Sequence, residues 1–161
     1  MTNLLHRVST VFVAVLLVSC ATTTSAPVSG RAPMTDILGI RLGMPRDTVR
    51  SSLANTARLE REERRRHEVW TVNDHPSYAS LIIGYTPEWN VRFVTAVAKP
   101  DGTPVRYDEV LDTAVADHRA AGATHTWTWA TGATGTPKYY VIAIGGPERL
   151  EYLSIKDQPG D

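Results

Sequence analysis

The sequence predicts a single α+β domain in which two short helices pack on an antiparallel sheet of about six to seven strands, in the order α-ββββ-α-βββ. Two segments, Met44–Leu53 and Arg106–Ala121, repeat their apolar residues with a helical period. The other regular segments are rich in β-branched and aromatic residues, as strands are. Their connections are short and carry turn residues, which requires antiparallel neighbours.

The first 19 residues have the pattern of an export signal. An apolar run, Val11–Val18, follows a single cation at Arg7 and is shorter than the ~20 residues that span a bilayer. The run ends in Leu17-Val18-Ser19-Cys20, which matches the pattern that lipoprotein signal peptidase reads. We therefore predict a lipoprotein signal peptide over residues 1–19 and lipidation of Cys20. The alternative is an ordinary cleaved signal peptide beside a coincidental cysteine.

Cys20 is the only cysteine in the chain, and lipidation explains an unpaired thiol in an exported protein. Each buried CH₂ of a palmitate-type chain contributes about 0.8 kcal/mol, so several acyl chains make a permanent anchor. The residue after the cysteine is Ala21. In related lipoproteins an Asp at this position is the signal for retention in the inner membrane, and this chain lacks it. The predicted location is the cell envelope, anchored to the outer membrane and facing the periplasm.

Residues 20–35 are small, polar and interrupted by Pro and Gly, which predicts a flexible tether. Residues 36–157 remain for one domain with one hydrophobic core, and residues 158–161 form a tail. The 17 Lys and Arg residues balance 17 Asp and Glu residues. No net charge would attract nucleic acid, so no nucleic-acid partner is expected.

The first helix is expected to begin near Pro45, whose fixed φ suits a first helical turn. Asp47 lies where it favours the helix dipole, and Met44, Val49 and Leu53 form one apolar stripe. A helix this short is stable only when packed, so the stripe must contact the strands that follow.

A charged segment, Arg58–His67, follows the first helix. It is expected to form a solvated edge strand and a hairpin tip, because charge discourages pairing at a sheet edge. The alternative is a docking patch for an anionic partner, made of Arg64, Arg65 and Arg66.

The remaining elements are expected as two groups of three strands separated by the second helix. On that helix, Arg106–Ala121, one face holds Val110, Leu111, Ala114, Val115 and His118, and Gly122 occupies a C-cap position. The strands are predicted over Glu68–Val72, Ala79–Tyr85, Val91–Ala98, Thr124–Ala130, Lys138–Ile144 and Leu150–Lys156.

Three residues on one predicted strand, His125, Trp127 and Trp129, alternate and therefore share one face of the sheet. If that face meets a helix, they belong to the core. If it is open, they are partner-binding residues and form an aromatic platform for a protein partner or a glycan. Tyrosines on neighbouring strands would enlarge this platform.

No catalytic motif is present in the sequence. The histidines at 67, 75, 118 and 125 are far apart, with no His-x-His or His-x₃-His pair, so no metal site and no cofactor are expected. Asp101, Asp108, Asp112 and Asp117 could meet a histidine in space, but no nucleophile elbow or phosphate loop accompanies them.

One motif suggests a family. Gly43-Met44, Val49 and Leu53, preceded by Ile40-Arg41-Leu42, resemble the opening of the SmpA/OmlA-type small lipoproteins of the outer-membrane β-barrel assembly machinery. The resemblance covers residues 37–98 and implies helices on an antiparallel sheet, similar to β-lactamase inhibitor protein. Pro45, Thr48 and Ala54-Asn55 depart from the family's pattern.

The expected function is a non-catalytic binding or assembly module, lipid-anchored in a bacterial envelope. The resemblance implies an accessory of an outer-membrane protein complex. The alternatives are a periplasmic inhibitor or ligand-binding module with an aromatic platform, and an envelope hydrolase.

Overall fold

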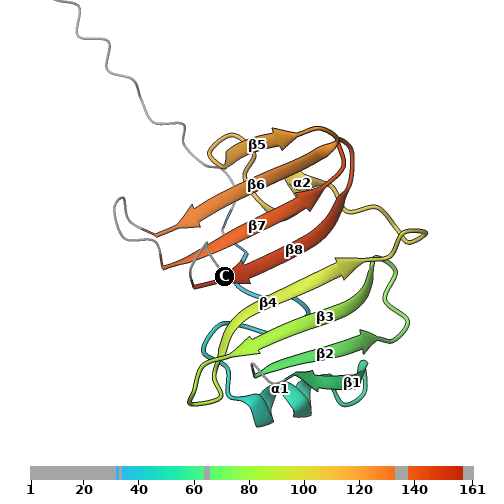
Figure 1. Ribbon diagram of the computed structural model, residues 1–161, viewed down its shortest axis with the longest axis vertical. Helices are drawn as coiled ribbons and strands as arrows, with labels where there is room; N and C mark the ends of the chain where they lie inside the picture. Colours follow the sequence, from blue (N-terminus) through green and yellow to red (C-terminus); the bar gives the residue numbers. More distant parts are fainter. Residues whose placement is uncertain (1–31, 33, 64–65, 133–137, 158–161) are drawn as a thin grey trace, which may run out of the picture.

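The computed structural model describes residues 32, 34–63, 66–132 and 138–157. In this part of the chain, one antiparallel sheet of eight strands carries two short helices (Figure 1). The first half comprises α1 (Arg46–Leu53), β1 (Ala57–Glu63), β2 (His67–Val72), β3 (Tyr78–Tyr85) and β4 (Val91–Ala98). The second half comprises α2 (Tyr107–Val110), β5 (Asp117–Ala121), β6 (Thr124–Thr131), β7 (Tyr139–Gly145) and β8 (Leu150–Lys156).

The strands lie in the order β1-β2-β3-β4-β8-β7-β6-β5. Each half is a meander that follows a helix, and the last strand of one half pairs with the last strand of the other. At this seam the hydroxyls of Thr95 and Ser154 lie 2.7 Å apart in a hydrogen bond. The second half therefore repeats the element order of the first, and β1 and β5 form the two edges of the sheet.

The predicted fold class is wrong. The described chain is mostly an antiparallel sheet of eight strands with two short helices, not an α+β domain of six to seven strands in the order α-ββββ-α-βββ. The error lies in one segment: the helix expected over Arg106–Ala121 is a single turn, and its last five residues are strand β5.

The second helix ends early because Asp112 turns the chain. Leu111 is already extended, at φ −144° and ψ 164°. The Asp112 carboxylate then accepts the N–H of Ala114 at 3.0 Å, and its carbonyl accepts the N–H of Ala116 at 3.0 Å. An Asp side chain that bonds nearby backbone in this way competes with a helix. The chain after the turn pairs with β6 instead.

The first helix lies where the sequence places it. Pro45 is its N-cap residue, and Val49 and Leu53 are buried on its inner side. Gly43, at φ +77°, donates its N–H to the Val91 carbonyl at 2.7 Å, which joins the chain before α1 to β4. A positive φ here favours glycine, which accounts for the residue at this position.

One face of the sheet is covered by the helices and holds the core. The strand side chains that point to this side form one cluster with apolar residues of both helices. The central members are Trp70, Leu81, Ile83, Val94, Ala96, Val141, Ala143, Leu153 and Ile155. We call this the covered face and the opposite side the open face. In the described residues, no helix is long and apolar enough to cross a membrane.

Candidate functional site

The open face is built from the strand positions that alternate with the core. Ile82 pairs with Val69 and Thr95, and Ile142 pairs with Thr128 and Ser154. Because successive side chains of a strand point to opposite sides, these residues lie on the side away from the helices.

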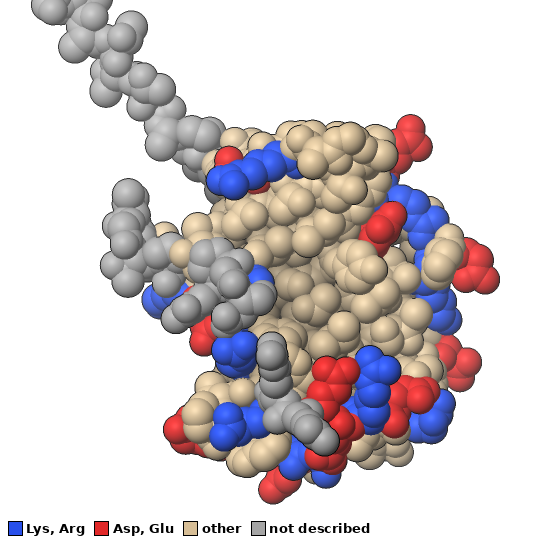
Figure 2. Space-filling model, viewed as in Figure 1, with Lys and Arg blue, Asp and Glu red and all other residues tan. Residues whose placement is uncertain are grey.

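Most of the open face is uncharged, although Lys156 of β8 lies on it as the cross-strand partner of Phe93 and Tyr140. The uncharged part consists of aliphatic, aromatic and hydroxyl side chains from β2 to β4 and from β6 to β8: Val69, Ile82, Phe93, Thr95, Val97, Tyr140, Ile142, Ile144, Tyr152, Ser154, Thr126 and Thr128. Figure 2 shows a broad uncharged area over β6, β7 and β8, with charged side chains at its margins. Tyr152 is the most prominent member, with 42% of its surface exposed.

Two shallow hollows occur on this face. One, of about 360 Å³, lies over β5, β6 and β7, with Thr126, Thr128, Ile142 and Ile144 at its base. The other, of about 330 Å³, is lined by Val97, Tyr152 and the chain around Pro100. The open face therefore offers hollows that a partner's side chains can enter, in addition to contact area.

The aromatic strand predicted as core or platform lies on the covered face. Trp129 is 7% exposed and belongs to the core, so the core reading holds for this residue. Trp127 is half-buried, packs against the core and contributes to the wall of a hollow of about 750 Å³ beside α2. His125 is half-buried at the end of the same row.

The histidine expected on a helix is placed differently. His118 is exposed on strand β5, where its cross-strand partner is Trp127. Its ring stacks on the indole of Trp127, with centroids 4.1 Å apart, and its Nε2 lies 3.0 Å from Nδ1 of His125. The sequence could not place this pair, because the two residues meet only across the β5–β6 hairpin.

The other predicted residues lie at the margins of the sheet or outside the residues that the structure describes. Arg66 is exposed at the β1–β2 turn, with φ +59°. Arg64, Arg65, Cys20, the signal peptide and most of the tether lie outside the described residues. Asp117 pairs with Arg119 at 3.3 Å. In the described part of the chain, no three His, Cys, Asp or Glu residues converge as metal ligands.

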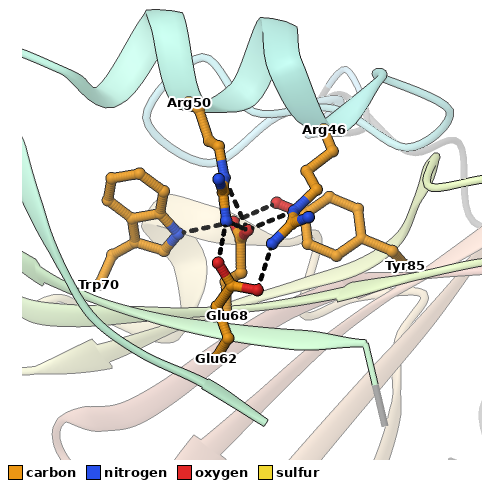
Figure 3. A network of polar contacts seen from close by, with 6 residues as sticks. All are labelled: Arg46, Arg50, Glu62, Glu68, Trp70 and Tyr85. Carbon is orange, nitrogen blue, oxygen red and sulfur yellow. Dashed lines mark hydrogen bonds and ion pairs between the residues drawn. The ribbon is translucent and has the colours of Figure 1, made fainter. Parts of the chain in front are cut away.

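A buried carboxylate that the sequence analysis did not single out fixes α1 to the sheet. Glu68 points inward from β2 and is 1% exposed. Its Oε1 accepts hydrogen bonds from Arg46 at 2.6 Å and from Arg50 at 2.7 Å, and its Oε2 accepts from Trp70 Nε1 at 3.1 Å and from Tyr85 at 2.7 Å (Figure 3).

Two further residues, Glu62 and Trp89, contact the arginines of this cluster. The exposed carboxylate of Glu62 pairs with Arg46 at 2.5 Å and also with Arg50. The indole of Trp89 stacks on the Arg46 guanidinium, 4.3 Å from the ring centre. Every buried side-chain nitrogen and oxygen in the described residues has a partner. A fully satisfied network of this kind is a structural clamp rather than a reactive site.

The clamp changes the titration of its members. Burial alone raises the pKa of Glu68, but hydrogen bonds from Tyr85, Arg46 and Arg50 outweigh it, so the pKa lies below its ordinary value. Burial, and then the hydrogen bond to Glu68, raise the pKa of Tyr85. Glu68 is therefore an anion and Tyr85 a neutral donor at neutral pH.

Comparison with protein-family models, curated proteins and solved structures finds no significant match to this chain. The site is therefore interpreted from its own geometry.

Proposed function

We propose that the protein is a non-catalytic binding module, held at a bacterial envelope membrane by lipidated Cys20, and that it binds a protein partner on the open face of its sheet. The observation that carries this proposal is the largely uncharged surface of aliphatic, aromatic and hydroxyl side chains around Tyr152, which is 42% exposed, and the half-buried Ile144; the neighbouring Ile142 is 8% exposed. Large exposed apolar patches on a soluble domain mark interaction sites.

The chemistry of this face favours a protein over other partners. The centre of a protein interface is depleted of charge and enriched in aromatic residues, as this surface is. A nucleic acid would need Lys and Arg along a groove. On the open face, Lys156 lies between Phe93 and Tyr140. The arginines on this side of the edge strands are each paired with a carboxylate: Arg58 with Glu60, Arg61 with Glu63, and Arg119 with Asp117.

The clamp supports this role by keeping the sheet rigid. Glu68 ties α1 to β2 and β3 from the covered side, so the opposite face is held without taking part in these contacts. A partner then meets a preformed surface, and less entropy is lost on binding.

The membrane part of the proposal rests on Leu17–Cys20, and the assembly part on the resemblance to the SmpA/OmlA-type lipoproteins. The motif residues also have structural roles, since Gly43 joins β4 and Val49 and Leu53 enter the core. A role as accessory of an outer-membrane protein complex is therefore the more specific form of the proposal.

Site-specific photocrosslinking in cells tests the proposed face. A photoreactive amino acid replaces Tyr152 or Ile144 on the open face, and Thr48 on the exposed side of α1 serves as the matched control. Both open-face positions should crosslink to the same discrete protein, and position 48 should not. Adding Tyr152→Glu should abolish the crosslink from position 144 while leaving thermal unfolding unchanged.

Three outcomes contradict the proposal. These are crosslinking from position 48 to the same protein, crosslinking of the open face to lipid alone, and crosslinking of the open face only to a second copy of this chain. The last would show that the face serves self-association.

A further inference from the structure

Two imidazoles meet at the edge of the sheet, in a place that the proposed function does not use. His118 lies on the edge strand β5 and His125 on β6, with the Gly122–Ala123 turn between the two strands. Their side chains share the covered face, and Nε2 of His118 lies 3.0 Å from Nδ1 of His125. The rings are nearly parallel, at 21°.

The hydrogen-bonded separation of the two nitrogens is also close to the one at which a single metal ion would hold two imidazole ligands. With metal–nitrogen bonds of about 2.0–2.1 Å, two ligands are about 2.8–3.0 Å apart at a right angle and about 3.3–3.4 Å apart at the tetrahedral angle. The observed 3.0 Å lies within the range that these two angles define. The pair therefore needs ring rotation, not movement of the strands, to bind one ion.

The surroundings leave room for that rotation and for further ligands. His118 is exposed and His125 is half-buried. On one side His118 is supported by the indole of Trp127, 4.1 Å away and nearly parallel to it at 18°. Trp127 is in turn held by Tyr107, with ring centres 6.1 Å apart. The indole supports one face of the imidazole, and His118 remains exposed at the strand edge.

We propose that His118 and His125 form a two-imidazole binding site for a divalent transition-metal ion, with water completing the coordination. Cu²⁺ should bind more tightly than Ni²⁺ or Zn²⁺, because imidazole sites follow the Irving–Williams order. Mg²⁺ and Ca²⁺, which prefer oxygen ligands, should not compete.

Binding requires a defined change in the hydrogen bond that joins the rings. A neutral pair shares one N–H between Nε2 of His118 and Nδ1 of His125. When both atoms bind the ion, each ring carries its proton on its other nitrogen. The ion takes the place of the shared hydrogen, and no proton is lost from the neutral pair.

Trp127 provides a local reporter. Cu²⁺ quenches indole fluorescence at contact distance, and this indole stacks on one of the proposed ligands. The full-length chain, purified without a polyhistidine tag, is titrated with CuCl₂ by calorimetry and by tryptophan fluorescence. His118→Ala and His125→Ala test the ligands. His67→Ala, which removes a half-buried imidazole from β2, is the matched control.

The parent and His67→Ala should bind Cu²⁺ with equal affinity and quench to the same extent. Loss of a hydrogen-bond partner of a ligand typically costs about 10–100-fold in metal affinity, so loss of either ligand should cost at least ~10-fold. Trp127→Phe should lose most of the quenching, because it removes the indole that stacks on His118. Circular dichroism of the metal-free variants confirms that each is folded.

Parent-like Cu²⁺ affinity in His118→Ala or His125→Ala overturns the proposal, as does quenching in Trp127→Phe that is as strong as in the parent. The parent's Cu²⁺ spectrum by electron paramagnetic resonance gives a further check. Hyperfine coupling to two nitrogens is expected, and coupling to none contradicts a two-imidazole site.

Discussion

The phenolic O–H of Tyr85 donates a hydrogen bond of 2.7 Å to Oε2 of Glu68, and both residues are buried. Through Glu68 this bond connects the end of β3 with the two arginines of α1. A carboxylate taken out of water is tolerated only when its lone pairs are fully used, which here they are. Glu68 thus determines how α1 sits on the sheet.

Glu68→Gln should destabilise the fold by about 2–3 kcal/mol. The amide cannot accept from both arginines and both neutral donors, although Arg46 and Arg50 are partly exposed and regain some hydration. Chemical denaturation measures the loss. Glu62→Gln is the matched control, because Glu62 contacts the same two arginines from the solvent side. It should cost far less, and equal losses would show that burial of Glu68 has no special role.

Stability should fall in acid for the same reason. The pKa of Glu68 is lower in the folded chain than the ordinary value of 4.5, so the unfolded chain takes up this proton first as pH falls. The stabilisation from Glu68 is complete above about pH 4.5 and is lost as pH approaches the folded-state pKa. Denaturation at several pH values should show a shallower acid decline for Glu68→Gln than for the parent. Parallel declines would place the acid sensitivity elsewhere.

Trp129→Ala should cost about 3–5 kcal/mol, because it leaves a large cavity in the core. Trp127→Ala is the internal comparison, since its indole is half-buried and stacks on the exposed ring of His118. A smaller loss is expected there. If both variants unfold like the parent, the covered face is not packed as described.

Cys20→Ser should release the full-length protein from the membrane fraction. Without the thiol, no acyl chain is attached and the chain loses its anchor. Ser19→Ala is the control, because it keeps a small residue before the cysteine. Fractionation with a metabolically incorporated palmitate analogue measures both attachment and location. Equal membrane retention of Cys20→Ser would argue for an ordinary cleaved signal peptide.

Most strands could be predicted because their burial alternates. The bounds of β4 and β8 agree with the sequence, and the other interior strands differ by a residue or so at an end. Along β2, for example, the buried residues are Glu68, Trp70 and Val72, which is the period of two that identifies a half-buried strand. Glu68 lies two residues before Trp70 on the same strand, so the two side chains share a face. This spacing could have identified Glu68 as an inward-facing carboxylate.

Strand β5 could not be predicted because it buries nothing. All five residues are exposed, so no alternation distinguishes it. Gly122 added to the error: its φ of +61° suits a helix C-terminus and also the tight turn that it forms between β5 and β6. With β5 assigned to a helix, His118 and His125 could not be brought together. Pairing with the free edge of β6 decides the conformation, and only the folded sheet reveals it.

The place of β8 has a consequence for how the protein is made. Although it is the last of the eight strands in the chain, β8 lies in the interior of the sheet, between β4 and β7. During synthesis or export, β4 emerges long before β8, and the edge of β4 that pairs with β8 stays unpaired until then. The two meanders can join only after Leu150–Lys156 has emerged. Their union therefore follows the emergence of β8, and a chain that stalls before it would present the unpaired edge of β4 to other proteins.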